Sequence, residues 1–262
     1  MRPLLASFIV VVLGLPHPAR AQSNQSPIVT DRPDFTESSE VIHRGGFQFE
    51  SGMAIATDGS GADRVRAFAA PFALMRIGLA PRIELRLGAD GYTTEDAGGV
   101  HASGYSDFGI GAKVRLFDQD QIGVDLAVLP ILALPVGSDE FSAGRYNPAI
   151  KITWARAMAA GFDLTGNINV SALSDAEGRF HQEAVSVSAG HDLFAGWGSY
   201  AEIYGFSRID RDGGSAITLN GGVTRPVGGR MQFDVEAGHG LTGSAVDWFL
   251  GAGFAIRGSL WR

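Results

Sequence analysis

The sequence predicts an all-β protein, specifically a transmembrane antiparallel up-and-down β-barrel of twelve strands. Segments of about ten residues alternate apolar and polar side chains, which is typical of strands with one face against lipid and the other lining an interior. Tight turns between these segments alternate with longer polar connections, as in bacterial outer-membrane barrels. The composition of 36 glycines, 10% aromatic and 19% charged residues suits a glycine-rich sheet better than a helical bundle.

Two stretches illustrate the alternation. Between Ile83 and Asp90 the aliphatic side chains share one face, and Glu84 and Arg86 lie on the other. A two-residue period is the side-chain period of a β-strand, so the polar face of this stretch is predicted to line the interior. The same split in the stretch 231–237 places three polar residues on the inner face: Gln232, Asp234 and Glu236.

Twelve segments follow this pattern. They span residues 46–57, 63–79, 82–93, 104–117, 121–134, 147–157, 162–171, 181–193, 197–207, 215–225, 230–240 and 247–257. An even number of strands places both ends of the barrel on one side of the membrane, which we expect to be the periplasm. The first and last strands must pair, because an open sheet edge in hydrocarbon would leave backbone groups without hydrogen bonds.

The connections support this topology. Tight ones, such as Ala80-Pro81 and Ala195-Gly196, are predicted to be periplasmic turns. Longer polar ones are predicted to be external loops, at residues 95–103, 135–146, 172–180 and 208–214. Pro71 cannot donate a ladder hydrogen bond, so we expect a bulge or break in the second segment.

The first residues have the features of an export signal. Arg2 supplies a positive charge, Leu4 to Leu15 form an apolar run, and Ala19-Arg20-Ala21 places small residues at the cleavage site. We therefore expect a signal peptide at residues 1–21, cleavage near Gln22, and a mature chain in the outer membrane of a Gram-negative envelope. No later stretch reaches the roughly 18 apolar residues that a membrane-spanning helix needs.

Composition also narrows the partners. The sequence contains no cysteine, so it forms neither a disulfide nor a lipid-modified N-terminal cysteine. A net charge of -7 argues against nucleic acid, which requires a basic surface. No group of residues has the spacing of a metal site, and the Gly-x-Gly pieces lie within predicted strands, so we expect no metal and no cofactor. A soluble β-sandwich is the alternative fold.

Charges of both signs recur on the predicted inner face. A charge buried alone is costly, so these groups must pair with one another or meet water. They could form salt bridges that brace a narrow lumen, or charged rings that tune what passes; their balance predicts little ion preference. The predicted lumen-lining residues are Glu50, Arg64, Arg66, Arg76, Glu84, Arg86, Asp107, Lys113, Arg115, Asp125, Lys151, Glu202, Tyr204, Asp234 and Glu236.

Residues 22–45 precede the first strand, and the stretch 30–39 is too polar to enter lipid. This segment could form a tether inside the lumen or at its rim, or it could form a flexible periplasmic tail. A twelve-stranded barrel leaves interior space that side chains, a chain segment or water must fill, which favours the tether. Four charged side chains could then meet the wall charges: Asp31, Arg32, Asp34 and Glu37.

Aromatic residues have two predicted roles. Those near strand ends are expected to form the aromatic girdles of the membrane interface: Trp154, Trp197, Tyr200, Trp248 and Trp261. Tyr204 and Phe206 instead share a face with Glu202, so we expect them to point inward, where they could contact an aromatic solute.

Several motifs together resemble the outer-membrane family named after the meta-pathway of phenol degradation. They are Thr30-Asp31-Arg32-Pro33-Asp34-Phe35, Gly46-Phe47-Gln48-Phe49-Glu50, Arg82-Ile83-Glu84-Leu85-Arg86, Gly104-Tyr105-Ser106-Asp107-Phe108-Gly109, Leu134-Pro135-Val136-Gly137, Ala201-Glu202-Ile203-Tyr204-Gly205 and Gln232-Phe233-Asp234. The likeness covers nearly the whole mature chain. It implies an outer-membrane barrel with a role in moving small molecules, aromatic or hydrophobic ones among them.

Three functions follow from these features. We expect a passive outer-membrane channel or transporter for small molecules; the alternatives are a sealed structural or binding barrel that acts through its external loops, and a membrane-embedded lipid-acting enzyme. We expect no enzyme, because Gly104-Tyr105-Ser106 is followed by Asp107-Phe108 and does not complete a Gly-x-Ser-x-Gly elbow. The expected partners are outer-membrane lipid, a small-molecule solute and the barrel-assembly machinery, and the oligomeric state is left open.

Overall fold

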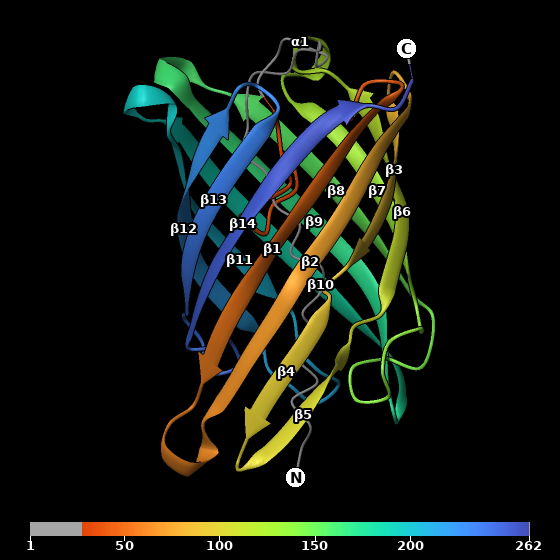
Figure 1. Ribbon diagram of the computed structural model, residues 1–262, viewed down its shortest axis with the longest axis vertical. Helices are drawn as coiled ribbons and strands as arrows, with labels where there is room; N and C mark the ends of the chain where they lie inside the picture. The colour runs from red at the N-terminus through yellow and green to blue at the C-terminus, as the bar shows by residue number, and fades with distance from the viewer. Residues whose placement is uncertain (1–27, 262) are drawn as a thin grey trace.

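The computed structural model describes residues 28–261 as one antiparallel sheet that closes on itself (Figure 1). The predicted signal peptide, residues 1–21, lies outside the described residues. Strand β1 (Gly46–Asp58) pairs with β2 (Val65–Ala80) on one side and with the last strand, β14 (Trp248–Ser259), on the other. This pairing of first and last strands satisfies the backbone groups of both edges, as an environment of hydrocarbon requires.

The other strands follow one another around the barrel. They are β3 (Ile83–Ala89), β4 (Tyr92–Ala97), β5 (Val100–Tyr105), β6 (Phe108–Phe117), β7 (Asp125–Leu134), β8 (Asn147–Ala157), β9 (Phe162–Asp175), β10 (Gly178–Asp192), β11 (Gly198–Phe206), β12 (Ala216–Val227) and β13 (Met231–Gly240). Helical turns are short: η1 (Gly61–Asp63), α1 (Gln119–Ile122), η2 (Ala159–Gly161) and η3 (Phe194–Gly196). Between residues 28 and 261, no helix is long and apolar enough to span a membrane.

The fourteen strand segments make a barrel of twelve strands. β2 pairs with both β3 and β4, so these two are one barrel strand interrupted at Asp90-Gly91. Likewise β5 continues into β6 across Ser106-Asp107, because β4 pairs with β5 while β3 pairs with β6. The predicted all-β, twelve-stranded, up-and-down architecture is confirmed.

Side-chain alternation separates the two faces of the wall. In β13, Phe233 and Val235 are 48% and 54% exposed, whereas Asp234 and Glu236 are 3% and 6% exposed. The apolar residues therefore face outward and the charged ones face the interior. This inverts the arrangement of a water-soluble domain and matches a wall with acyl chains outside it.

One bulge changes which face a sequence position occupies. Gly52 pairs with Phe72 and Ala54 with Ala69, so two residues of β2, Ala70 and Pro71, lie opposite a single residue of β1. This is the irregularity that Pro71 predicted.

The bulge overturns two predicted positions in the lumen. Beyond it the inward parity of β2 reverses, so Arg66 pairs with the outward residue Thr57 and is exposed. Arg64 lies in the turn before β2 and is also exposed. The prediction that Arg64 and Arg66 line the lumen is wrong, because one extra residue moves every side chain on its far side to the other face.

The two ends of the barrel differ. One end, which we call the turn end, carries the connections predicted to be periplasmic turns, α1 and the C-terminal end of β14 (Figure 1). The other, which we call the loop end, carries the connections predicted to be external loops. Two predicted loops at the loop end, 95–103 and 172–180, are wrong, because strands β4–β5 and β9–β10 continue through them to the two-residue turns Gly98-Gly99 and Ala176-Glu177. Polar residues beyond the membrane can stay in strand because ladder pairing does not require an apolar face. Irregular loops do occupy 135–146 and most of 207–215.

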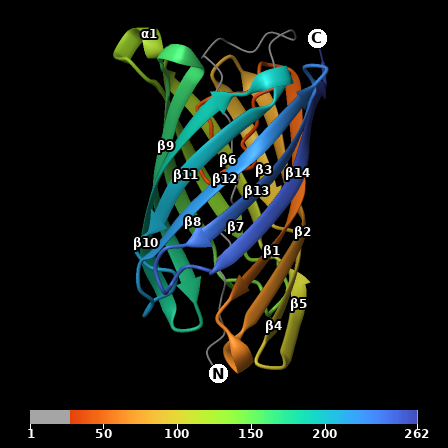
Figure 2. The ribbon, with the colours of Figure 1, turned by 90° about the vertical axis from the view of Figure 1, so that its left-hand side faces the viewer.

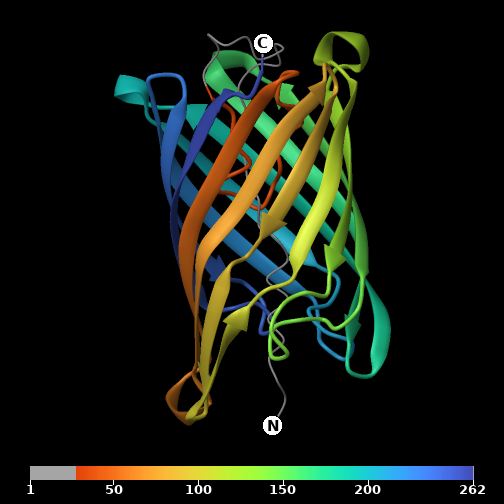
Figure 3. The same cartoon turned by 45° about the vertical axis from the view of Figure 1, so that its right-hand side comes forward.

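Residues 28–42 run inside the barrel (Figures 2 and 3). Every residue from 28 to 42 is buried, and we call this stretch the lumenal segment. It leaves the lumen at the turn end through Gly45, whose φ of 79° favours glycine. The Gly45 N–H donates to the Gly78 carbonyl at 2.9 Å, and the Leu260 N–H donates to the Gly45 carbonyl at 2.8 Å.

Candidate functional site in the occluded lumen

The interior of the barrel gathers most of the predicted wall residues around the lumenal segment. Closure of the sheet brings them together from strands far apart in sequence. The wall residues with inward side chains are Glu50, Arg76, Glu84, Arg86, Lys113, Arg115, Asp125, Lys151, Glu202, Tyr204, Asp234 and Glu236.

Asp31 is the main ionic anchor of the lumenal segment. Its carboxylate contacts Lys113 Nζ at 3.0 Å, Arg76 Nη1 at 3.2 Å and Arg86 Nη1 at 2.5 Å. Burial alone would raise the pKa of Asp31, but the attraction of Arg76, Lys113 and Arg86 holds it well below its ordinary value. The Asp31 carboxylate is therefore ionised and held by three cations from β2, β3 and β6.

Carboxylates of the wall complete this network. Arg76 Nε donates to Glu84 at 2.9 Å, and Arg76 Nη1 to Glu50 at 3.2 Å. The backbone N–H of Asp31 in turn donates to Glu50 at 3.0 Å. Arg76, Arg86 and Lys113 thus each have carboxylate partners from both the wall and the segment, which offsets the cost of removing charge from water.

Two more acidic residues of the segment pair with basic residues of the wall. Glu37 contacts Lys151 Nζ at 2.5 Å and Arg86 Nη2 at 2.9 Å. Glu40 contacts Arg115 Nη1 at 2.9 Å. Burial raises the pKa of Glu40 to about 7, although Arg115 opposes this shift.

The opposite wall holds the segment mainly through acceptors. Glu202 of β11 accepts the backbone N–H groups of Phe35 and Thr36, both at 2.7 Å. On β13, Asp234 contacts Arg32 Nη2 at 2.9 Å, and Gln232 Nε2 donates to the Thr30 hydroxyl at 2.7 Å. These bonds fix the backbone of the segment, because two of them end on main-chain amides.

Aromatic rings fill the loop-end side of this wall. Phe35 of the segment stacks on Tyr204 with ring centroids 4.6 Å apart and an interplanar angle of 13°. It also packs edge-on against Phe206 at 5.3 Å. The inward aromatic pair is thus covered by a ring of the chain itself.

A model of the family described as "Putative MetA-pathway of phenol degradation" matches residues 30–258. The chain belongs to this family. The match begins within the lumenal segment, so the phenol-degradation family model includes this segment together with the barrel wall.

Solved structures of outer-membrane proteins share the fold of this family member. An outer membrane channel from Pseudomonas putida F1 has a TM-score of 0.59 and 14% identity, over 84% of this chain and 98% of that one. The β domain of the Bordetella autotransporter BrkA has a TM-score of 0.51 and 13% identity, over 81% of this chain and 98% of that one. The NanC porin has a TM-score of 0.51 and 6% identity, over 80% of this chain and 98% of that one. These identities show the fold alone, and a search of the curated proteins found no match.

Two other predicted positions in this phenol-degradation family barrel differ from the structure. Asp107 lies at the break between β5 and β6, where its carboxylate accepts the N–H groups of Gly137 and Ala143 at 3.0 Å each and so holds the loop 135–146. The prediction that Tyr200 belongs to an aromatic girdle is wrong, since it is 5% exposed and its hydroxyl donates to Glu236 at 3.3 Å. Tyr200 lies two residues from Glu202 on one strand, which places both on the inner face.

Some lumenal contacts were not predicted. Glu40 extends the acidic series of the segment, and its proximity to Asp31 and Glu37 in sequence is the signal that could have found it. Gln48 shares the inward parity of Glu50 and donates to the segment at 2.8 Å. Gln232, which alternation places on the inner face, also donates to the segment, at 2.7 Å. The two-residue period of β1 is the signal that could have found Gln48, because it lies two residues from Glu50.

Proposed function

We propose that this protein is a passive outer-membrane channel for small molecules, and that the lumenal segment closes it at rest. The observation that carries the proposal is the combination of an apolar exterior with a polar, enclosed interior. A wall of this kind separates lipid from a hydrophilic path. Membrane lipid surrounds the barrel, a small solute uses the path, and the barrel-assembly machinery inserts it.

The chemistry of the closure suits a removable segment. Its ion pairs and hydrogen bonds can exchange for bonds to water, so release of the segment leaves groups that water can solvate. Within residues 28–261, the segment 28–42 joins the wall through the stretch around Gly45, and no disulfide forms because the chain has no cysteine. The segment can therefore leave without breaking a covalent bond.

Aromatic compounds are the solute class that the lumen suits best. The description of the matching family names phenol degradation. Phe35, a side chain of the protein itself, stacks on Tyr204 in the lumen at 4.6 Å, which supports a place for an aromatic ring there. A solute ring that took the place of Phe35 would find the same stacking partners.

Deletion of residues 23–39 tests the closure. In a planar lipid bilayer we expect single-channel conductance to rise severalfold over that of the intact protein, because the deletion removes most of the segment that fills the lumen. Arg66→Gln is the matched control, since Arg66 lies outside the lumen, and it should conduct like the intact protein. Circular dichroism should show unchanged β-sheet content.

The same experiment addresses the sealed structural barrel. If the deletion variant folds and inserts but passes no more current than the intact protein, the lumen is closed by something other than the segment, and the channel proposal fails.

A further inference from the structure

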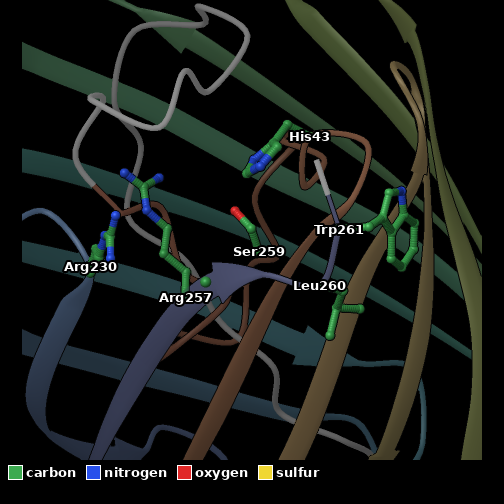
Figure 4. A pocket seen from close by; sticks show the side chains of 7 residues that line it. His43, Arg230, Arg257, Ser259, Leu260 and Trp261 are labelled. Carbon is green, nitrogen blue, oxygen red and sulfur yellow. The ribbon is translucent and has the colours of Figure 1, made fainter.

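The two sides of the rim at the turn end carry different basic residues. His43 and Arg257 lie on the inner side, at the mouth of the lumen (Figure 4). On the outer face, alternation along β8 and β12 places Arg156 and Arg225, because Thr153 and Thr224 of the same strands face the interior. These two arginines therefore face the membrane and not the lumenal segment.

The turn between β10 and β11 holds Arg225 in place. The Arg225 guanidinium group lies over the Trp197 ring, 5.6 Å from the ring centroid, and donates to the Ala195 carbonyl. Across the β12–β13 ladder, Arg225 pairs with Phe233, which is 48% exposed on the outer face. The guanidinium group therefore lies at the turn-end edge of the apolar band that contacts acyl chains.

The same turn exposes apolar side chains. Phe194 is 83% exposed, the largest fraction among the large apolar residues described between 28 and 261, and Trp197 is 41% exposed. This turn, η3, leans away from the axis of the barrel at the upper left of Figures 1 and 3. A position at the lipid interface would take these side chains out of water, which favours a membrane contact here.

Charge on this part of the outer face is unbalanced. Within the described strands β8–β13, Glu183 is the acidic residue that alternation places outward, and it lies toward the loop end. Asp192, close to the turn, has the opposite parity and faces the interior. Neither Arg156 nor Arg225 forms an ion pair with a described residue. The outer face at the turn end is therefore basic.

We infer that Arg225, Trp197 and Phe194, which we call the headgroup site, bind the headgroup of an anionic phospholipid in the membrane leaflet at the turn end. A guanidinium group binds a phosphate through paired, charge-assisted hydrogen bonds. The indole N–H of Trp197 can donate to a further lipid oxygen, while its ring and that of Phe194 pack on the glycerol and the upper acyl chains.

The position of the headgroup site specifies a lipid as its occupant. The Arg225 guanidinium group and the exposed Phe233 side chain are neighbours on one outer face. A phospholipid satisfies both, because it joins an anionic head to acyl chains, whereas a soluble anion would leave the apolar side chains uncovered. This inference does not depend on whether the lumen conducts.

Native mass spectrometry of the full mature protein in a non-ionic detergent tests the inference, with phosphatidylglycerol or phosphatidylcholine added. Phosphatidylglycerol should bind saturably and about fivefold more tightly than phosphatidylcholine, because one arginine at a membrane surface favours an anionic lipid by about that factor. Arg225→Gln should weaken phosphatidylglycerol binding by about fivefold. Arg225→Lys keeps the charge but loses the planar group that lies over Trp197, so a loss of about twofold is expected.

Arg82→Gln is the matched control. It removes the same charge at the same end of the barrel, but Arg82 already contacts Asp118, so phosphatidylglycerol affinity should stay within about twofold of that of the intact protein. Circular dichroism should show the same β-sheet content for every variant.

Fluorescence places the bound lipid. The chain has four tryptophans, and Trp154→Phe, Trp248→Phe and Trp261→Phe together leave Trp197 as the single emitter. Phosphatidylglycerol brominated near the top of its acyl chains should quench Trp197, and adding Arg225→Gln should reduce the quenching.

Three results would overturn the inference: equal affinities of the intact protein for the two lipids, equal phosphatidylglycerol binding by Arg225→Gln and Arg82→Gln, or quenching of Trp197 that Arg225→Gln does not change. A protein dimer that protects Trp197 from the brominated lipid would also overturn it and would assign this surface to a second copy of the chain.

Discussion

The two sides of the lumen hold the segment in different ways. On the side of β2, β3 and β6, Asp31 contacts three buried cations, and burial does not neutralise it. On the side of β11 and β12, Asp34 lies near Glu202 and the Ser188 hydroxyl, and none of the ion pairs between described residues involves its carboxylate. The buried hydroxyl of Thr224 on β12 has no hydrogen-bond partner among the described residues.

This difference indicates which side of the lumen binds the segment more strongly. Burial, with Glu202 adding to it, raises the pKa of Asp34 well above its ordinary value. An acid held near another acid without a cation contributes little to docking, whereas an acid between three cations contributes much. We expect the segment to separate first from the β11–β12 side and last from the β2–β6 side.

The largest effect is expected for Asp31→Asn. It leaves three buried cations with less compensating charge, which costs about 3 to 5 kcal/mol of docking free energy for the segment. Because the chain has no cysteine, a single Ser39→Cys substitution in the buried segment can report release through labelling by a membrane-impermeant thiol reagent. Labelling should be slow in the Ser39→Cys protein and at least tenfold faster when Asp31→Asn is added. Equal rates would refute the anchor role of Asp31.

Raising the pH should loosen the segment. The pKa of Glu40 is raised to about 7 in the folded protein, so its carboxyl group binds a proton more tightly when the segment is docked. This proton binding stabilises the docked segment fully below about pH 4.5, the ordinary pKa of glutamate, and the stabilisation is lost as the pH rises through 7. The loss amounts to at most about 3 kcal/mol. Asp31 has a lowered pKa and stays ionised throughout this window. Labelling at Ser39→Cys, corrected for thiol ionisation with a free-thiol standard, should be faster at pH 8 than at pH 5.

Glu40→Gln provides the control for this pH dependence. The amide cannot ionise, so the corrected labelling rates at pH 5 and pH 8 should converge toward the lower value. If the Glu40→Gln variant keeps the full pH dependence of the Ser39→Cys protein, another group causes that dependence, and Asp34 is the next residue to test.

A smaller effect is expected for Glu202→Gln. The substitution weakens the bonds to the Phe35 and Thr36 amides but removes the repulsion of Asp34, so we expect a loss of about 1 to 2 kcal/mol in docking. Bilayer recordings should show brief openings with this variant and long ones with Asp31→Asn. The inferred difference in docking strength between the two sides is refuted if Glu202→Gln releases the segment as fully as Asp31→Asn.

The smallest effect is expected for Phe35→Leu. It removes the stack on Tyr204 and the edge contact with Phe206. These ring contacts contribute about 1 kcal/mol to the docking free energy, in addition to the burial of apolar area. Closure should persist, but uptake of phenol into proteoliposomes should increase relative to that of an aliphatic alcohol of similar size. Equal increases for both solutes would exclude a specific aromatic site.

Local sequence accounts for the wall and only partly for its inner face. Alternation in β13 assigns Asp234 and Glu236 to the interior because the side-chain period of a strand is two and needs no knowledge of neighbours. The same reasoning failed at Arg66, since the bulge at Pro71 adds one residue and its exact place depends on pairing with β1. Tyr200 was misplaced because its chemistry suits both an interface and a lumen.

The sequence by itself determined that this chain forms a closed barrel with an apolar outside and a charged inside, because both follow from short-range periodicity and from the backbone's need for hydrogen bonds in lipid. Only the tertiary structure decided that Asp31 meets Arg76, Arg86 and Lys113, and that Phe35 covers Tyr204. Those partners lie on different strands, and their distances are set by closure of the barrel and by the path of the segment within it. Local patterns carry no information about either.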